Sequence, residues 1–449
     1  MSVRLAASSR PGAIASRHDY THQHQNPVKA VAESSRVSPL HNRLSSVAIR
    51  SGSFFVPVAV ENGPRPCKCL TGSRCGLESD LNGDCVAQSR RRLWRAQASQ
   101  SGTALRPEVE TVGFNDGSAT RFAPLINGCW TLAGGHGRVV ESEIIHVMEM
   151  YARSGLTSFD TADIYGPSES ILGAFREQWM NNKQENDGLR DVQIFTKFCP
   201  NIFRMKMTPQ VVEQSIRRSI AALRVPKLDL VQMHWWDYDM PGMVDVAKSL
   251  AELREKGLIT SIGVTNMSTE ALSQIIDAGV PVVCNQVQFS LLDQRPRMAM
   301  LKYCKERDIK LFTYGTLAGG LLSNRYLEEG KKGLFGKVNY TTPDLNTSSL
   351  KMYWRVVREA GGEGHWRKLL STLGEIAASK EVSIASVALR WAMQQGPVHP
   401  IVGLRNSTHL DDNLTALSFS LEPAEMDKIE EVLRTSQGPR GDCYEMERS

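Results

Sequence analysis

The segment that decides the fold runs from Val192 to Thr265. It contains three short apolar runs: VQIFTK at 192–197, LDLVQMH at 228–234 and TSIGVT at 260–265. Two stretches of helical length separate these runs. In the first stretch apolar residues recur at spacings of three or four, which places them on one helix face: Val212, Ile216, Ile220 and Leu223. Strands that alternate with amphipathic helices predict a parallel sheet.

The ends of both predicted helices carry ordinary start and stop signals. Thr208 before Pro209 supplies a helix N-cap followed by a proline at the first helical position. The second helix repeats the apolar spacing and is followed by Gly257, a residue suited to the left-handed conformation after a helix. Its apolar face is predicted to contain Met243, Val246, Leu250 and Leu253.

The same alternation continues in both directions from about residue 112. It gives eight candidate strands: Ala123–Trp130, Thr157–Asp160, Val192–Lys197, Leu228–His234, Thr260–Thr265, Val282–Phe289, Lys310–Tyr314 and His399–Gly403. Eight units predict an α/β fold of the closed (β/α)8 TIM-barrel type. An open doubly wound sheet is the competing fold, but the glycines after the first strand, Leu132-Ala-Gly-Gly-His-Gly137, do not match Gly-x-Gly-x-x-Gly. A polar, Gly-rich insertion at 323–363 and an amphipathic helix at Leu421–Leu433 extend the barrel.

Charge separates the chain into a leader and a body. The 449 residues hold 53 Lys+Arg and 48 Asp+Glu, yet residues 1–100 alone hold 14 basic and 6 acidic residues, so the remainder is slightly acidic. A basic leader on a nearly neutral body does not indicate a nucleic-acid partner. No apolar run reaches the length of a membrane span, so no membrane partner is expected. We predict a disordered leader at 1–110, a barrel at 111–435 and a C-terminal tail at 436–449.

The leader is rich in Ser and Arg and poor in acids, as organelle transit peptides are. Its Ser content favours a plastid over a mitochondrion. An ordinary disordered tail is the alternative, and the protein would then be cytoplasmic. Four of the nine cysteines lie here, at spacings that match no regular zinc site, so no metal is predicted and a small metal knuckle stays an alternative: Cys67, Cys69, Cys75 and Cys85.

Polar residues close successive strands, where a barrel collects its functional groups. Asp160, Lys197 and His234 follow one another at intervals of 37 residues, and Tyr165 lies just beyond Asp160. A Lys ammonium would lower the pKa of a nearby Tyr hydroxyl, and Asp160 would keep that Lys protonated. Tyr165 could then donate a proton to a carbonyl oxygen that His234 orients. Taken singly, Asp160 and Lys197 could be a structural ion pair, and Tyr165 or His234 a packed core residue.

Together these residues resemble the aldo-keto reductase family. The resemblance rests on Asp160-x4-Tyr165, Lys197, His234, Ser261-Ile-Gly-Val-Thr-Asn266 and Asn285-Gln-Val-Gln288, and it covers roughly residues 112–435. Gln286-Val-Gln-Phe-Ser-Leu-Leu-Asp293 is nearest to the branch of bacterial and plant reductases and potassium-channel β subunits. The resemblance implies NADPH-dependent reduction of an aldehyde or ketone, with Tyr165 as proton donor and with NADPH favoured over NADH.

The resemblance also implies a set of cofactor contacts. Thr265, Asn266 and Gln286 would hold the nicotinamide carboxamide, and Tyr314 would stack on its ring. The pyrophosphate would meet the turn of Leu317, Ala318, Gly319 and Gly320, and the adenosine end would meet Gly403, Arg405 and Asn413. Trp235 and Trp236 would line the substrate pocket. The family's Tyr-Ser-Pro-Leu reads Tyr314-Gly-Thr-Leu317 here, so a Ser hydroxyl is missing, and Thr316 is its candidate replacement.

Two other functions use the same residues. A regulatory, nucleotide-binding subunit like the channel β subunits is one alternative, although the leader argues against it. A lyase that forms a Schiff base on Lys197 is the other. The expected partner is a small-molecule carbonyl compound, whose identity the sequence leaves open, and the chain is expected to be a monomer or a weak homo-oligomer.

Overall fold

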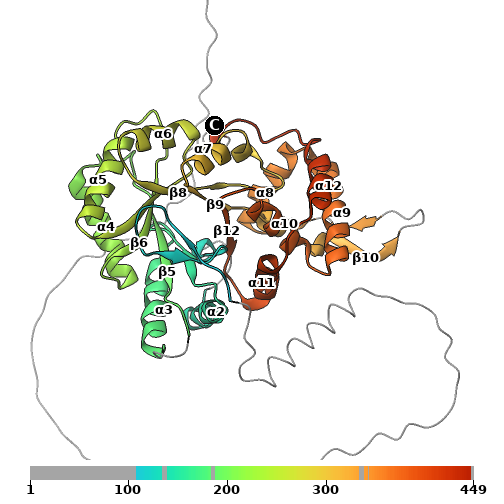
Figure 1. Ribbon diagram of the computed structural model, residues 1–449, viewed down its shortest axis with the longest axis horizontal. Coiled ribbons are helices and arrows are strands. Elements are labelled where there is room, and N and C mark those ends of the chain that lie inside the picture. The colour runs from blue at the N-terminus through green and yellow to red at the C-terminus, as the bar shows by residue number, and fades with distance from the viewer. Residues whose placement is uncertain (1–107, 134–138, 184–187, 333–337, 342, 446–449) are drawn as a thin grey trace, which may run out of the picture. The chain divides into compact units, whose positions relative to one another are not determined.

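Eight parallel strands close into a barrel in the computed structural model, which describes residues 108–133, 139–183, 188–332, 338–341 and 343–445 (Figure 1). Each strand pairs with the next along the chain, and the last pairs with the first. The strands are β3 (Ile126–Gly128), β4 (Ser158–Asp160), β5 (Gln193–Phe198), β6 (Leu228–His234), β7 (Ile259–Thr265), β8 (Val282–Gln288), β9 (Lys310–Tyr314) and β12 (Val398–Gly403). The predicted (β/α)8 barrel is confirmed, and the doubly wound sheet is wrong.

The first strand is shorter than expected. It begins after Pro124, which has no N–H for a strand ladder, and it ends before a 3₁₀ turn, η1 (Trp130–Leu132). The helices around the barrel are α2 (Glu141–Arg153), α3 (Ser168–Asn182), α4 (Pro209–Leu223), α5 (Met243–Glu255), α6 (Thr269–Asp277), α7 (Met300–Glu306), α10 (Ile384–Met393) and α11 (Leu410–Ser418). In α4 the predicted cap is present, because the Thr208 side chain accepts a hydrogen bond from Val211 N.

Alternation along the strands fills the barrel in layers. Side chains two apart on a strand share a face. An apolar layer lies near the start of the strands and contains Phe195, Leu230, Cys284 and Phe312. Two positions further on, the same face carries Lys197, Gln232, Gln286 and Tyr314. The interior therefore changes from apolar to polar toward the carboxyl ends of the strands. Gly263 leaves room for this packing, because a Cβ there would clash with the thiol of Cys284.

A short hairpin closes the apolar end of the barrel. Its strands β1 (Val112–Gly113) and β2 (Arg121–Phe122) pair antiparallel. Phe114 stacks on Phe122 with ring centroids 4.9 Å apart and also contacts Phe195 and Phe312. These rings belong to one buried cluster, so the hairpin acts as a plug.

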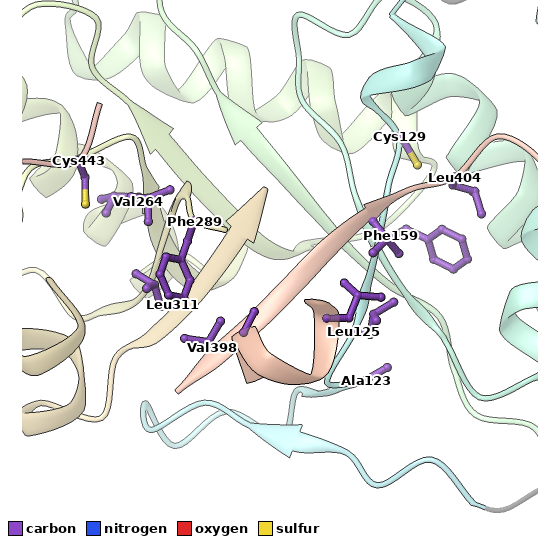
Figure 2. Packing of buried hydrophobic residues seen from close by; sticks show 14 of the residues in the cluster. Ala123, Leu125, Cys129, Phe159, Val264, Phe289, Leu311, Val398, Leu404 and Cys443 are labelled. Atoms are coloured by element: carbon purple, nitrogen blue, oxygen red, sulfur yellow. The ribbon is translucent and has the colours of Figure 1, made fainter. Parts of the chain in front are cut away.

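The outer faces of the strands pack against the helices in a second, larger core (Figure 2). This core also takes in parts of the chain outside the eight β/α units. The predicted terminal helix is present as α12 (Pro423–Leu433), with Ile429 and Leu433 buried. Cys443, far along the predicted tail, is also buried in it.

The insertion after β9 is folded. It forms a hairpin of β10 (Leu327–Lys332) and β11 (Val338–Tyr340) and then helix α8 (Ser348–Glu359). A long helix, α9 (Gly362–Lys380), returns the chain to α10. Residues 436–445 also pack on the barrel: the Asp442 carboxylate accepts hydrogen bonds from Thr269 N (2.8 Å) and Thr269 Oγ1 (3.3 Å) at the start of α6.

Several predictions fall on residues that the structure does not describe. The leader up to residue 107, with Cys67, Cys69, Cys75 and Cys85, lies outside the described residues, as do 134–137 and 446–449. None of the helices in the described ranges is both long and apolar enough to cross a membrane.

Candidate active site

A buried ion pair lies at the centre of the polar end of the barrel. Lys197 Nζ on β5 is 2.5 Å from Asp160 Oδ2 at the end of β4, and both side chains are 4% exposed. The ammonium also donates to the carbonyl oxygen of Thr161 at 2.8 Å. Burial alone would lower the pKa of Lys197, but the charge of Asp160, its hydrogen bond and the charge of Tyr165 together outweigh burial, and the pKa is raised. The prediction that Asp160 keeps Lys197 protonated agrees with this geometry.

Two glutamine amides hold the other oxygen of Asp160. Gln232 Nε2 donates to Asp160 Oδ1 at 2.9 Å, and Gln286 Nε2 donates to the same oxygen at 2.8 Å. Gln286 also donates to Gln232 Oε1 at 2.7 Å. Gln232 was missed in the sequence, although it lies two residues before His234 and therefore on the same inward face. The carboxylate is thus fixed by three donors from three strands.

Tyr165 lies beside the ion pair on the loop after β4. The Lys197 Nζ is 4.9 Å from the centroid of the Tyr165 ring. Backbone hydrogen bonds tie this loop to β5, from Thr161 N to Phe195 O and from Asp163 N to Lys197 O. Burial raises the pKa of Tyr165 to about 12, and the Lys197 charge lowers it by less. The expectation of a net lowered pKa is therefore wrong, because desolvation of the phenolate outweighs the attraction of the ammonium.

Asp163 is a second carboxylate on this loop. Both of its oxygens accept the N–H of Cys199 at 3.2 Å, which ties the loop to the chain just after β5. Burial raises the pKa of Asp163 to about 6, although the backbone N–H lowers it. Burial likewise raises the pKa of the Cys199 thiol. Neither residue was singled out in the sequence, where Asp163 reads as an ordinary loop carboxylate.

His234 is at the end of β6, where the sequence predicted it. Its ring centroid is 4.1 Å from that of Trp236 and 5.6 Å from that of Tyr444. Trp236 and Tyr444 line the same cavity as Asp160, Tyr165 and Lys197. Trp235 does not: it is 1% exposed, and its Nε1 donates to Met240 O at 3.2 Å. The expectation that Trp235 lines the pocket is therefore wrong, because consecutive side chains point in opposite directions. Tyr444 comes from the C-terminal tail and was missed.

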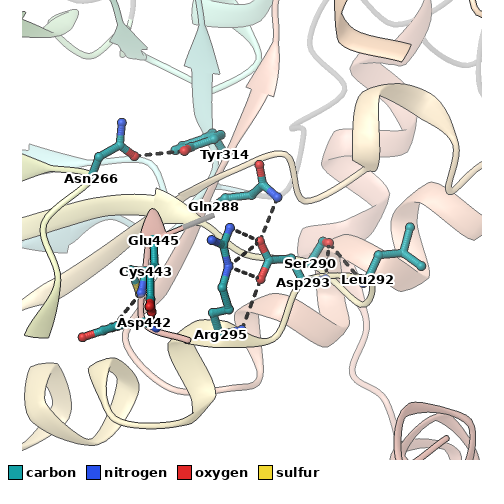
Figure 3. A network of polar contacts seen from close by, with 10 residues as sticks. All are labelled: Asn266, Gln288, Ser290, Leu292, Asp293, Arg295, Tyr314, Asp442, Cys443 and Glu445. Atoms are coloured by element: carbon teal, nitrogen blue, oxygen red, sulfur yellow. Dashed lines mark hydrogen bonds and ion pairs between the residues drawn. The ribbon is translucent and has the colours of Figure 1, made fainter. Parts of the chain in front are cut away.

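The residues predicted to hold the nicotinamide surround the same mouth. Thr265, Asn266, Gln286 and Tyr314 all line the cavity. The Tyr314 hydroxyl donates to Asn266 Oδ1 at 2.9 Å, which fixes the ring across two strands (Figure 3). Figure 3 also shows a buried ion pair between Asp293 and Arg295, and Gln288 Nε2 donates a hydrogen bond to the Asp293 carboxylate.

The predicted pyrophosphate turn follows β9. Leu317, Gly319 and Gly320 line the cavity, whereas Ala318 is buried behind them. Gly315, Gly319 and Gly320 all have positive φ, which suits glycine. Thr316 Oγ1 contacts Thr313 Oγ1 at 3.1 Å and Thr313 O at 3.3 Å. Its hydroxyl is therefore bonded back to its own strand.

The cavity continues from this turn to the third predicted group. Gly403 and Arg405 line it, together with His409, Asp411 and Asp412. Asn413 is buried beside them, and its Nδ2 is a donor with no hydrogen-bond partner in the described part of the chain. The whole cavity measures about 2150 Å³. Unlike Gly403 and Arg405, Asn413 is not among the residues that line the cavity. A groove of this size, with a glycine turn in its lining, suits an extended dinucleotide.

Among the described residues, no group of three or more His, Cys, Asp or Glu is arranged to hold a metal ion. The side chains gathered at the mouth of the barrel are a phenol, an ammonium, a carboxylate and an imidazole. A long groove lies beside them at the carboxyl end of a closed barrel, where barrel enzymes bind small molecules, and side chains of these types can transfer protons.

Comparison with known proteins agrees. The model of the aldo/keto reductase family matches residues 124–434, so the chain belongs to this family and is an oxidoreductase of the aldo-keto reductase type. Such enzymes reduce small carbonyl compounds and generally use NAD(P)H. The chain is 27% identical over 333 residues to the chloroplastic pyridoxal reductase of Arabidopsis thaliana, covering 70% of this chain and 84% of that protein. It is 26% identical over 327 residues to probable aldo-keto reductase 1 of Glycine max, covering 71% and 87%.

A solved structure shows the same fold. The glycerol dehydrogenase AKR11B4 of Gluconobacter oxydans superposes with a TM-score of 0.59 at 22% identity, covering 74% of this chain and 98% of that chain.

Proposed function

We propose that this protein reduces an aldehyde or ketone to an alcohol with NADPH and that Tyr165 donates the proton. The observation that carries the proposal is the arrangement of Asp160, Lys197 and Tyr165 at the mouth of the barrel, with the Lys197 ammonium 4.9 Å from the Tyr165 ring. When bound, the nicotinamide supplies the hydride to the carbonyl carbon.

The side chains divide the proton chemistry between them. Tyr165 keeps its proton at neutral pH because its pKa is high. An alkoxide is a much stronger base than a phenolate, so the proton still passes from Tyr165 to the reduced oxygen. The Lys197 ammonium then faces the phenolate and stabilises its charge. We expect His234, whose ring packs against Trp236, to donate a hydrogen bond to the same oxygen and orient it.

The same geometry argues against the two alternatives. A Schiff base needs a neutral amine, whereas Lys197 is held as an ammonium by Asp160 and by the carbonyl of Thr161. A purely regulatory nucleotide-binding subunit has no need of a complete proton-transfer set. We therefore favour a catalytic reductase over a Schiff-base lyase or a regulatory subunit.

A panel of carbonyl substrates with NADPH tests the proposal. Tyr165→Phe should lose about 10²–10⁴-fold in kcat, the usual contribution of general acid catalysis. Tyr303→Phe is the matched control, because Tyr303 lies in α7 outside the cavity lining and its hydroxyl has no hydrogen-bond partner in the described ranges. Full activity in Tyr165→Phe would show that the donor is assigned wrongly.

We further propose that Arg405 selects NADPH over NADH by binding the 2′-phosphate at the far end of the groove. Arg405 lines the groove there, but Asp411 and Asp412 line it as well and would repel a phosphate. Arg405→Ala should therefore weaken NADPH binding roughly tenfold or more and leave NADH binding nearly unchanged, measured as Kd by calorimetry. An equal loss for both nucleotides would contradict the assignment.

The substrate class follows from the wall of the pocket. Trp236, Tyr444, Ile164 and Trp130 line it near Tyr165, so we propose an apolar or aromatic carbonyl compound. Pyridoxal belongs in the panel because a chloroplastic pyridoxal reductase is among the relatives. We also propose a plastid location, which the basic leader and this relative support. A fluorescent protein fused behind residues 1–110 tests it, and a cytosolic signal would contradict it.

A further inference from the structure

The turn after β9 departs from the family's Tyr-Ser-Pro-Leu at two positions, Gly315 and Thr316. At the first of them the structure shows which side chain fills the space that the family's serine would occupy. Gly315 stands where the family's Tyr-Ser-Pro-Leu has serine. A Cβ on Gly315 would lie 2.6 Å from Cε1 and 2.8 Å from the hydroxyl oxygen of Tyr353. Its φ of +69° adds backbone strain for any other residue. The Tyr353 phenol thus fills the space that a side chain at 315 would occupy.

The same ring also covers the next glycine of the turn. A Cβ on Gly319 would lie 2.8 Å from Cδ2 of Tyr353. Tyr353 is 6% exposed, and the little surface that it keeps lines the cavity. The phenol is therefore wedged against the two glycines, with its hydroxyl on the side of Gly315.

A rigid element brings this hydroxyl to the turn. Tyr353 lies in α8, whose first turn is capped by Thr347 and whose Leu350, Val356 and Val357 are buried. Its neighbours Ser349 and Leu350 line the same cavity. Because α8 belongs to the insertion, nothing in the strand pattern of the barrel predicts its position.

The other candidate for the missing serine is Thr316, and its geometry is less suitable. Thr316 lines the cavity, but its hydroxyl lies within hydrogen-bond distance of both Thr313 Oγ1 and Thr313 O. A phosphoryl oxygen would have to compete with those contacts. The Tyr353 hydroxyl lies 2.8 Å from where a Cβ at position 315 would be, so it is the hydroxyl nearest to the place of the missing serine side chain.

We propose that the Tyr353 hydroxyl binds the pyrophosphate of the dinucleotide, in place of the family's serine. Gly315 is the counterpart of this exchange, since only a residue without Cβ leaves room for the phenol. The inference rests on the proposed nucleotide-dependent function. A phenol donates one hydrogen bond to a phosphoryl oxygen, and bonds to charged groups are among the stronger ones.

Calorimetric binding without any substrate tests the proposal. Tyr353→Phe should raise the Kd for NADP⁺ about tenfold. It should leave the Kd for 2′-AMP, which has no pyrophosphate, unchanged. Tyr326→Phe is the matched control, because Tyr326 is a buried tyrosine that does not line the cavity. This variant should bind both ligands as the wild type does.

The outcomes separate the two proposals. Wild-type protein that binds neither NADP⁺ nor NAD⁺ would overturn the proposed function and this inference with it. Normal binding of NADP⁺ by Tyr353→Phe would overturn the inference alone, as would an equal loss for NADP⁺ and 2′-AMP, which indicates a packing role.

A second pair of variants tests the contact itself. With Tyr353 present, Gly315→Ala should weaken NADP⁺ binding, because the new Cβ collides with the Tyr353 ring. In the Tyr353→Ala background the same change should cost several-fold less. Equal losses in both backgrounds would show that Tyr353 does not occupy this place.

Discussion

The ion pair between Asp160 and Lys197 allows stability and catalysis to be separated. The two groups are 2.5 Å apart, and each is 4% exposed. Removing one partner of such a pair leaves an uncompensated buried charge and costs about 3–5 kcal/mol, whereas replacing both can be nearly neutral. Asp160→Asn should be the most harmful single change, because its amide can point a second donor at the Lys197 ammonium.

The expected pattern is a stability rescue without a rescue of activity. We expect Asp160→Asn to lower the Tm by about 5–10 °C. Lys197→Met should lower it less, since Gln232 and Gln286 still donate to the carboxylate. The double variant should recover most of the loss in Tm. Its kcat should stay near that of Lys197→Met, because no ammonium faces Tyr165.

The Tm of the wild type, the two single variants and the double variant is measured by circular dichroism, which gives a double-mutant cycle. NADPH oxidation by the same four proteins gives kcat. Two results would refute the reasoning. Losses in Tm that simply add would show that the pair is not coupled in the folded state. Wild-type kcat in the double variant would show that the ammonium has no part in proton transfer.

Three further predictions concern the loop, the pocket wall and the plug. The pKa of Asp163 is raised from 3.8 to about 6, so the folded state holds this proton more tightly than the unfolded state. The free energy of unfolding should therefore fall as the pH rises from about 4 to 6. In urea unfolding, Asp163→Asn should be more stable than wild type by up to about 3 kcal/mol above pH 7 and equally stable at pH 4. Tyr444→Ala should raise the KM for bulky carbonyl substrates about tenfold, whereas Tyr444→Phe should keep the wild-type KM, because the ring packs against His234. A wild-type KM in Tyr444→Ala would show that Tyr444 does not contact the substrate. Phe114→Ala should cost about 3–5 kcal/mol, and its control Phe203→Ala, at a ring 65% exposed, close to nothing; similar losses in both would contradict the plug.

The sequence predicts the barrel and its central residues because both follow from short-range periodicity. Apolar residues recur every two positions in the strands and every 3.6 positions in the helices, and this periodicity marks the eight β/α units. A polar residue at the carboxyl end of a barrel strand lies at the mouth of the barrel. Asp160, Lys197 and His234 are therefore found from the pattern alone. Gln232 lies two residues before His234 on the same inward face of its strand. The alternation of side chains along the strand therefore predicts Gln232 in the site and places Trp235 on the opposite face.

Other parts of the site have no such signal. Tyr353 and Tyr444 reach the cavity from an insertion and from the chain's end, so only tertiary packing brings them there. The pKa of Tyr165 is set by how much water its ring excludes, which depends on every neighbour. A charge pattern predicts the sign of the Lys197 effect but cannot weigh it against desolvation.

The phenylalanine plug sets a boundary for processing of the N-terminus. Val109 O accepts a hydrogen bond from Arg190, and Phe114 completes the ring cluster inside the barrel. Cleavage anywhere before residue 108 would leave every described contact in place. Cleavage beyond Phe114 would open the end of the barrel to water and expose Phe122, Phe195 and Phe312. If the N-terminal segment is cleaved as we propose, the new N-terminus should lie upstream of Val109, which mass spectrometry of the purified protein can check. A variant that begins beyond Phe114 should expose these rings and aggregate more readily than one that begins at residue 108.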